Sequence, residues 1–140
     1  MSPFAYLLHE TRLAYGIRQS ELAERMGYEQ TYISALEVGS KGPPTAEFVE
    51  KLIATLELGA EEQARLIEAA DASQRKLILE IDSSSDTYWM LKELREQIQF
   101  LHPAQIKMIR DVLQLPETLK ERTIEPVHRL KRRRSEEARM

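Results

Sequence analysis

The chain has few side chains whose types and spacing suit enzyme chemistry. It contains no cysteine, which excludes disulfides, thiolate metal sites and a cysteine nucleophile. His9, His102 and His128 are scattered without the spacing of metal ligands, and no Gly-rich phosphate loop, nucleophile–base arrangement or carboxylate pair stands out. We therefore predict no metal site, no cofactor and no enzymatic activity.

The segment from Gln19 to Leu36 carries a more informative spacing. Two short helices that cross at a steep angle through a tight turn need a small residue in the middle of the first helix and a glycine in the turn. The second helix must also turn apolar residues inward three positions apart. Ala23, Gly27, Ile33 and Leu36 meet these demands. The sequence therefore predicts a helix-turn-helix in this segment.

Hydrophobic periodicity predicts helices along most of the chain, and hence an all-α fold. Five fall before residue 73, at about 4–15, 19–26 and 30–38, after an N-cap at Thr45, and at about 60–72. Two more are expected at about 86–101 and from Pro103 to near Pro116. Between these groups, residues 76–81 are rich in apolar and β-branched side chains. They could form one short strand or continue the fifth helix, and the serines that follow favour an extended segment.

Over about residues 4–58 the sequence resembles the Cro/repressor-type, or XRE-like, helix-turn-helix regulators of bacteria and phages. The resemblance is carried by Gly16-Ile17, Gln19, Leu22-Ala23, Met26-Gly27, Ile33, Leu36-Glu37, Gly39 and Pro44-Thr45. It implies a five-helix, lambda-repressor-like DNA-binding domain over residues 1–72. It also implies a structural ion pair between Arg12 and Glu37, which would tie the first helix to the end of the third.

The resemblance further implies how individual side chains meet DNA. Gln19 matches a glutamine that contacts a phosphate at a helix N-terminus. Base-edge contacts in the major groove are implied for Gln30, Thr31 and Ala35, with the Gln30 amide suited to bidentate bonds with adenine. Further phosphate contacts are expected from Tyr32, Ser34 and Lys41.

Two positions depart from the family pattern. Family members usually carry Ser or Thr where this chain has Arg18 and Glu29, so two helix caps are missing. Arg18 could compensate by contacting a phosphate. Glu29 would repel phosphate unless it accepts a hydrogen bond from a cytosine amino group.

The charge distribution favours a competing interpretation. Net charge is −3 overall, but residues 1–72 carry six Lys/Arg against twelve Asp/Glu, whereas residues 73–140 carry fourteen against eleven. An acidic first half is unexpected in a DNA-binding protein, because basic residues supply most of the non-specific affinity. The alternative is a protein-interaction module of the same fold, such as an antitoxin. Most of the acids, however, fall in the fourth and fifth helices, which in the family largely face away from DNA.

The second half allows two interpretations. We assign its helices to a helical extension over residues 73–125, which either forms a hydrophobic core or mediates dimerisation. The two roles are compatible. The candidate dimerisation residues are Trp89, Leu94, Ile98, Ile106, Ile109 and Leu113. Residues 126–140, with the basic run Arg129–Arg134, are expected to be a disordered tail that is either only solvated or adds phosphate contacts.

Together these observations predict a sequence-specific DNA-binding transcriptional regulator. A helix-turn-helix reads one half-site, so a homodimer would read an inverted repeat. We prefer repression to activation, because a dimer that occupies a promoter excludes the polymerase without needing any further component. No apolar run approaches the roughly 20 residues that span a bilayer, and the N-terminus lacks the pattern of a secretory signal, so we expect a cytoplasmic protein with no membrane partner.

Overall fold

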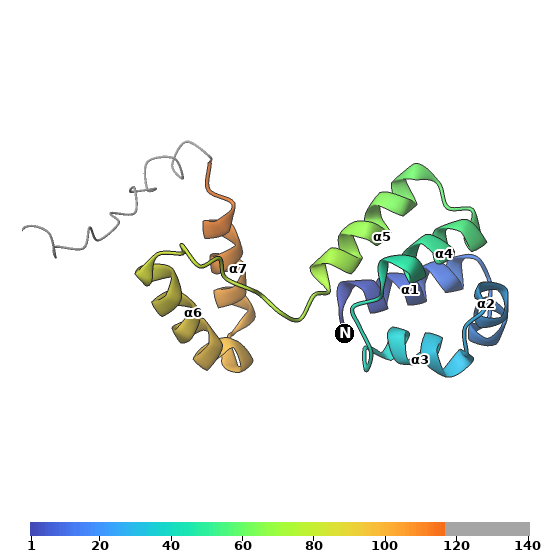
Figure 1. Cartoon of the computed structure of the whole chain (residues 1–140), viewed down its shortest axis with the longest axis horizontal. Helices are drawn as coiled ribbons and strands as arrows, with labels where there is room; N and C mark the ends of the chain where they lie inside the picture. The colour runs from blue at the N-terminus through green and yellow to red at the C-terminus, as the bar shows by residue number, and fades with distance from the viewer. Residues whose placement is uncertain (117–140) are drawn as a thin grey trace, which may run out of the picture. The chain divides into compact units, whose positions relative to one another are not determined.

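The computed structural model describes residues 1–116 and is all-α over that range. The chain divides into two compact units, Met1–Ile78 and the part that begins at Leu79. The elements, in chain order, are α1 (Pro3–Ala14), α2 (Gln19–Met26), α3 (Gln30–Val38), α4 (Ala46–Leu56), α5 (Ala60–Ala72), α6 (Ser85–Gln97), the 3-10 helix η1 (Ile98–Phe100) and α7 (Pro103–Leu113) (Figure 1). Within the described range, no helix is both long and apolar enough to cross a membrane.

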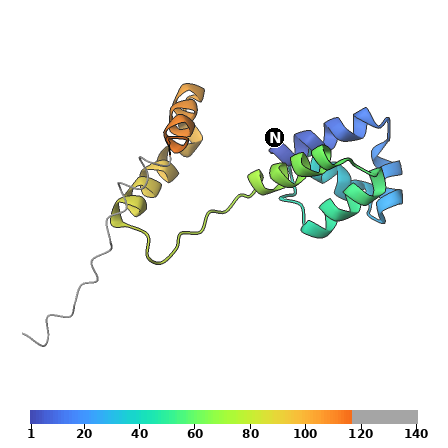
Figure 2. The ribbon, with the colours of Figure 1, turned by 90° about the horizontal axis from the view of Figure 1, so that it is seen from above.

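The first unit is a bundle of α1–α5 around one hydrophobic core (Figure 2). Helix α1 packs against α3 and α5, α2 packs against α3 and α4, and α4 packs against α5. Phe4 and Phe48 meet edge to face at the centre, with ring centroids 6.1 Å apart. Leu8, Ile33 and Leu52 are completely buried around them. Each such side chain contributes roughly 1.5–3 kcal/mol by leaving water.

Polar contacts fix the ends of these helices. The Thr45 hydroxyl accepts a hydrogen bond from the Phe48 amide (3.2 Å), as expected of the N-cap of α4. Ser73, directly after α5, is buried; its hydroxyl accepts from the Phe4 amide (2.9 Å) and donates to the Ala69 carbonyl (2.6 Å). Ser73 therefore joins the start of α1 to the end of α5.

The strand that the sequence allowed near 76–81 does not form among the described residues. Residues 74–80 leave the fifth helix and have no regular secondary structure. A strand needs a neighbouring strand to satisfy its backbone groups, and residues 1–116 contain no second strand. That part of the fold prediction is corrected, whereas the all-α class is confirmed.

In the second unit, Ser84 caps α6 through the Thr87 amide (3.2 Å) and His102 forms a capping box ahead of α7. The sixth helix was predicted to reach residue 101, but α6 ends at Gln97 and the chain tightens into η1. Pro103 is the first residue of α7, as predicted. None of the residues in α6, η1 or α7 is buried.

Candidate nucleic-acid interface

The turn between α2 and α3 has the geometry that the spacing predicted. Gly27 ends α2 in the left-handed region, with φ of 77°, which glycine adopts without steric cost. The next amide, that of Tyr28, donates to the Ala23 carbonyl at 2.9 Å and closes the turn. Ala23 is buried where the helices meet, and Ile33 and Leu36 of α3 are buried below it. Burial of one side of α3 leaves its other side free to contact a ligand.

The free side of α3 forms a shallow depression of about 450 Å³. Gln30 and Thr31 at the start of the helix are exposed, and Ser34 and Ala35 are half-buried one turn later. The complete lining is Gln30, Thr31, Ser34, Ala35, Val38 and Ser40. The fold thus brings together the three residues expected to read bases and one of those expected to contact phosphate.

Arg18 and Glu29 occupy the N-cap positions of α2 and α3, and neither side chain caps its helix. Both are exposed. The Thr31 hydroxyl donates to the Glu29 carboxylate at 3.5 Å, so this acid lies at the entrance to α3 beside a residue of the depression. The first-turn amides of both helices therefore stay free of side-chain caps and available to an anion such as phosphate.

The aromatic ring of Tyr32 packs against the hydrophobic core of the first unit. It stacks on Tyr28 with centroids 5.3 Å apart and meets Phe48 edge to face at 5.6 Å. Burial, followed by the neighbouring Tyr28, raises the pKa of the Tyr32 hydroxyl. The Lys41 ammonium lies 5.5 Å from the centre of the Tyr32 ring, on the loop after α3. Tyr32 and Lys41 are thus neighbours, but neither lines the depression.

A buried carboxylate fastens the ends of this motif together. Glu37, near the end of α3, is 4% exposed and accepts two hydrogen bonds from Arg12 of α1, from Nε at 2.5 Å and from Nη2 at 3.2 Å. Arg12 Nη1 also donates to the Ile17 carbonyl at 2.9 Å. The structure thus contains the ion pair that the resemblance implied.

Two further side chains reach Glu37. The Gln19 amide donates to its Oε2 at 2.7 Å, and Nδ1 of His9 lies 3.3 Å from the same oxygen. Burial raises the pKa of Glu37, but hydrogen bonds from Arg12, Gln19 and His9, together with the Arg12 charge, outweigh burial and lower it. Gln19 therefore links α2 to α3 and keeps its second N–H for the phosphate contact that the resemblance implies.

Sequence reasoning did not include His9 in this cluster. The signal was present, because His9 precedes Arg12 by three positions and so shares its face of α1. Within residues 1–116, no group of acidic and histidine side chains is arranged to hold a metal ion.

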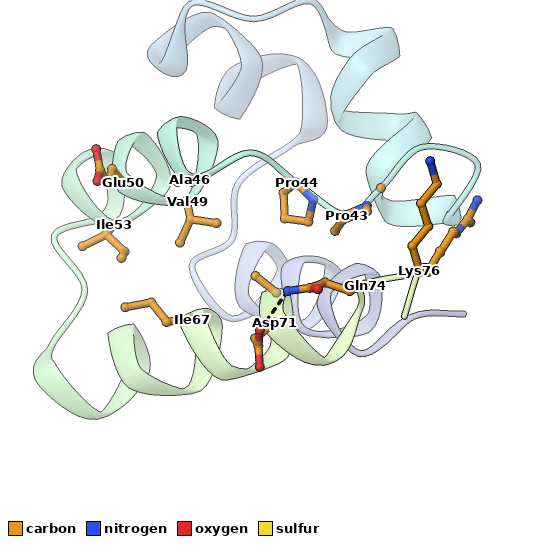
Figure 3. Close-up of a pocket in the computed structure, with 13 residues that line it drawn as sticks. Pro43, Pro44, Ala46, Val49, Glu50, Ile53, Ile67, Asp71, Gln74 and Lys76 are labelled. Atoms are coloured by element: carbon orange, nitrogen blue, oxygen red, sulfur yellow. Dashed lines mark hydrogen bonds between the residues drawn. The ribbon is translucent and has the colours of Figure 1, made fainter. Parts of the chain in front are cut away.

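A second hollow, which the sequence did not indicate, lies between α4 and α5 (Figure 3). It has a volume of about 780 Å³, and the loop Gly42–Pro44 forms part of its lining. Val49 and Ile53 of α4 face Ile67 of α5 across it. It shares no lining residue with the depression on α3.

Comparison with known proteins agrees with this geometry. Residues 3–66, which span α1–α4 and the first half of α5, match the family model described as a helix-turn-helix domain. Searches of curated proteins and of solved structures gave no match to the chain. By sequence similarity and by geometry, residues 3–66 of this chain form a helix-turn-helix domain.

Proposed function

We propose that the protein is a sequence-specific, non-enzymatic DNA-binding transcriptional regulator. The observation that carries this proposal is the depression on α3, where Gln30, Thr31, Ser34 and Ala35 gather on the exposed side of a helix-turn-helix. An α-helix fits the major groove, and an amide and a hydroxyl at its N-terminal end suit base edges. In this proposal residues 1–72 bind DNA, with Arg18, Gln19, Tyr32, Lys41 and, at a cytosine, Glu29 as flanking contacts.

The charge distribution is compatible with DNA binding. Seven of the twelve acids in residues 1–72 lie on α4, on α5 or in the turn between them: Glu47, Glu50, Glu57, Glu61, Glu62, Glu68 and Asp71. The segment up to Thr45 then carries five acids against four bases. One of those acids, Glu37, is already paired with Arg12. Residues 1–45, which include α3, are therefore nearly neutral in sum, and affinity must come from base contacts and from pairing two domains.

The second unit supports a homodimer. Five of the six candidate dimerisation residues are exposed, among them Trp89 at 59%, and Leu94 is half-buried. Large apolar side chains in such numbers usually mark an interface. We assign dimerisation to residues 73–125, which are described as far as residue 116. The basic run Arg129–Arg134 and the tail 126–140 lie outside the described residues.

A homodimer would place two α3 helices on an inverted repeat about one helical turn apart. By covering a promoter it would repress transcription, and it would act in the cytoplasm.

The exposed apolar second unit also suits another function, that of an antitoxin or other protein-interaction module. In that case the apolar residues would bind a different protein, and Glu29 at the start of α3 would oppose DNA binding.

Gel-shift titration of the full-length protein on DNA from its own upstream region tests the proposal. Binding should weaken steeply as salt rises, because bound phosphates release counterions. Gln30→Ala should weaken specific binding by about 1–3 kcal/mol, or roughly 5- to 150-fold, and should leave binding to random DNA unchanged. Gln74→Ala is the matched control, since this exposed glutamine follows α5 and lies outside the depression.

Two outcomes would contradict the regulator proposal. One is equal loss of affinity in the Gln30 and Gln74 variants. The other is a purified protein that ignores genomic fragments at low salt but co-purifies with a neighbouring gene product, which would support the antitoxin alternative.

A further inference from the structure

The hollow between α4 and α5 has the size and the apolar lining of a small-molecule site. Its volume of about 780 Å³ falls within the range of ligand pockets, roughly 300–1,000 Å³. Val49 belongs to the hydrophobic core, Ile53 and Ala70 pack against that core, and Ile67 is 57% exposed. A ligand with an aliphatic body would therefore lie on the outer surface of the core and remove Ile67 from water.

The lining also contains two adjacent cations, Arg75 and Lys76. Within residues 1–116, neither of them forms an ion pair with an acid. Arg75 follows Asp71 by four positions, but the Asp71 carboxylate accepts a hydrogen bond from the Gln74 amide instead, at 2.9 Å (Figure 3). Two neighbouring positive charges without an acidic partner favour the binding of an anion.

The Arg75 guanidinium is already held in place for such an anion. Its Nη2 donates to the Gly39 carbonyl at 2.7 Å, which fixes the group beside the loop after α3. A guanidinium has five N–H donors, so donors remain for a carboxylate, which can accept two of them at once. Lys76 adds a second positive charge next to this position.

The other acid of the lining does not oppose an anion at this end. Glu50 lies on α4, at the end of the hollow away from Lys76, and its side chain turns away from Ile67 (Figure 3). The charges of the lining are therefore separated along the hollow, with both cations at the same end.

We propose that the hollow binds a small aliphatic carboxylate. The aliphatic chain would lie against Val49, Ile53 and Ile67, and the carboxylate would accept hydrogen bonds from Arg75 and Lys76. This site is distinct from the depression on α3, with which it shares no lining residue, and it does not depend on the proposed function.

Three probes with the same eight-carbon chain test the class of ligand. Octanoate, octanol and octylammonium are titrated into the full-length protein, and backbone amide signals are followed by NMR. Octanoate should shift the amides of Val49, Ile53 and Ile67 and reach saturation. It should bind about tenfold more tightly than octanol, because hydrogen bonds from charged groups add to the burial of the chain. Octylammonium should bind most weakly, because both cations repel it.

Substitutions at the cationic end locate the carboxylate. Arg75→Gln and Lys76→Gln should each weaken octanoate by about threefold and leave octanol unchanged, since each removes one of two exposed charge contacts. Arg65→Gln is the matched control, because Arg65 is an exposed arginine of α5 outside the hollow, and it should leave both affinities unchanged.

A substitution in the apolar lining locates the chain. Ile67→Ser should weaken octanoate and octanol alike by about fivefold, because both chains lose the same contact. Ile67 is exposed, so the variant keeps the core. Leu13→Ser replaces a similarly exposed side chain of α1, 54% exposed and outside the hollow, and should change neither affinity.

The possible results separate the ligand class from the site. Octylammonium that binds as tightly as octanoate overturns the assignment of an anion. Shifts confined to α6 and α7, or equal losses in Ile67→Ser and Leu13→Ser, overturn the hollow as the site. None of these titrations contains DNA, so a negative result leaves the DNA-binding proposal standing, and failure of DNA binding leaves this site standing.

Discussion

Replacing Arg12 by alanine should strongly destabilise the first unit. The substitution removes both hydrogen bonds from the guanidinium to Glu37 and a third to the Ile17 carbonyl. Glu37 would remain as a buried carboxylate whose nearest charge partner has gone. Gln19, at 2.7 Å, and His9, at 3.3 Å, would still contact it.

The magnitude follows from the burial of the pair. Arg12 and Glu37 side chains are 11% and 4% exposed, so water screens their interaction little. Removing one partner of a buried pair costs about 3–5 kcal/mol, mainly because the remaining charge is desolvated and uncompensated. The two remaining neighbours of Glu37 place the expected loss near 3 kcal/mol. For a unit of this size, that loss lowers Tm by at least about 12 °C.

Urea denaturation followed by far-UV circular dichroism measures this loss. The only tryptophan, Trp89, lies in the second unit, so its fluorescence gives a separate readout of that unit. Arg25→Ala is the matched control, because Arg25 pairs with Glu21 at 2.6 Å but both side chains are about half exposed. That variant should lose less than about 0.5 kcal/mol.

A second variant distinguishes charge burial from simple loss of packing. Adding Glu37→Gln to Arg12→Ala should recover part of the stability, since it removes the uncompensated charge. The reasoning is refuted if Arg12→Ala costs no more than Arg25→Ala, or if Glu37→Gln in that background makes the loss worse.

Three further predictions use the same unfolding measurement. The pKa of Glu37 is lowered from its ordinary value of 4.5 in the folded state, so the contribution of Glu37 to the free energy of unfolding is fully present above about pH 4.5 and is lost as pH falls through the lower folded value. Glu37→Gln should therefore flatten the fall of the unfolding free energy at acid pH, and an unchanged slope would contradict this prediction. Thr45→Ala should cost about 1 kcal/mol, because the Phe48 amide loses its cap, and an unchanged midpoint would show that the cap contributes nothing. Gly27→Ala should cost about 1–2 kcal/mol through its φ of 77° alone, since no atom lies within 4 Å of an added Cβ; Gly27→Asn should cost less, and the reverse order would point to a steric cause.

The helix-turn-helix was predictable because each of its requirements is local. A glycine at position 27 both ends α2 and makes the turn, and the bounds of α2, α3 and α5 agree with those predicted. The depression on α3 follows from the same periodicity. Once Ile33 and Leu36 turn inward, Thr31 and Ala35 must turn outward, whereas Gln30 is exposed as the first residue of α3.

Contacts between distant positions were not predictable in this way. Gln19 was interpreted only as a phosphate contact, yet its amide also binds Glu37, eighteen positions away. Residues 76–81 were expected to be extended, but Ile81 lies in a turn, and the described residues contain no second strand with which the segment could pair. The hollow between α4 and α5 depends on how two helices diverge, which their separate periodicities do not determine.

The buried Ser73 hydroxyl has a consequence for how this chain can vary. It makes the last buried polar contact of the first unit, and the residues directly after it, Gln74 and Arg75, are exposed. If the chain ended after Ser73, or continued there into another segment, the core and the hydrogen bond from the Phe4 amide to Ser73 would remain. If it ended before Ser73, the Phe4 amide would lose its acceptor. Recombination can therefore attach a different C-terminal segment to the helix-turn-helix domain without changing the packing of its core.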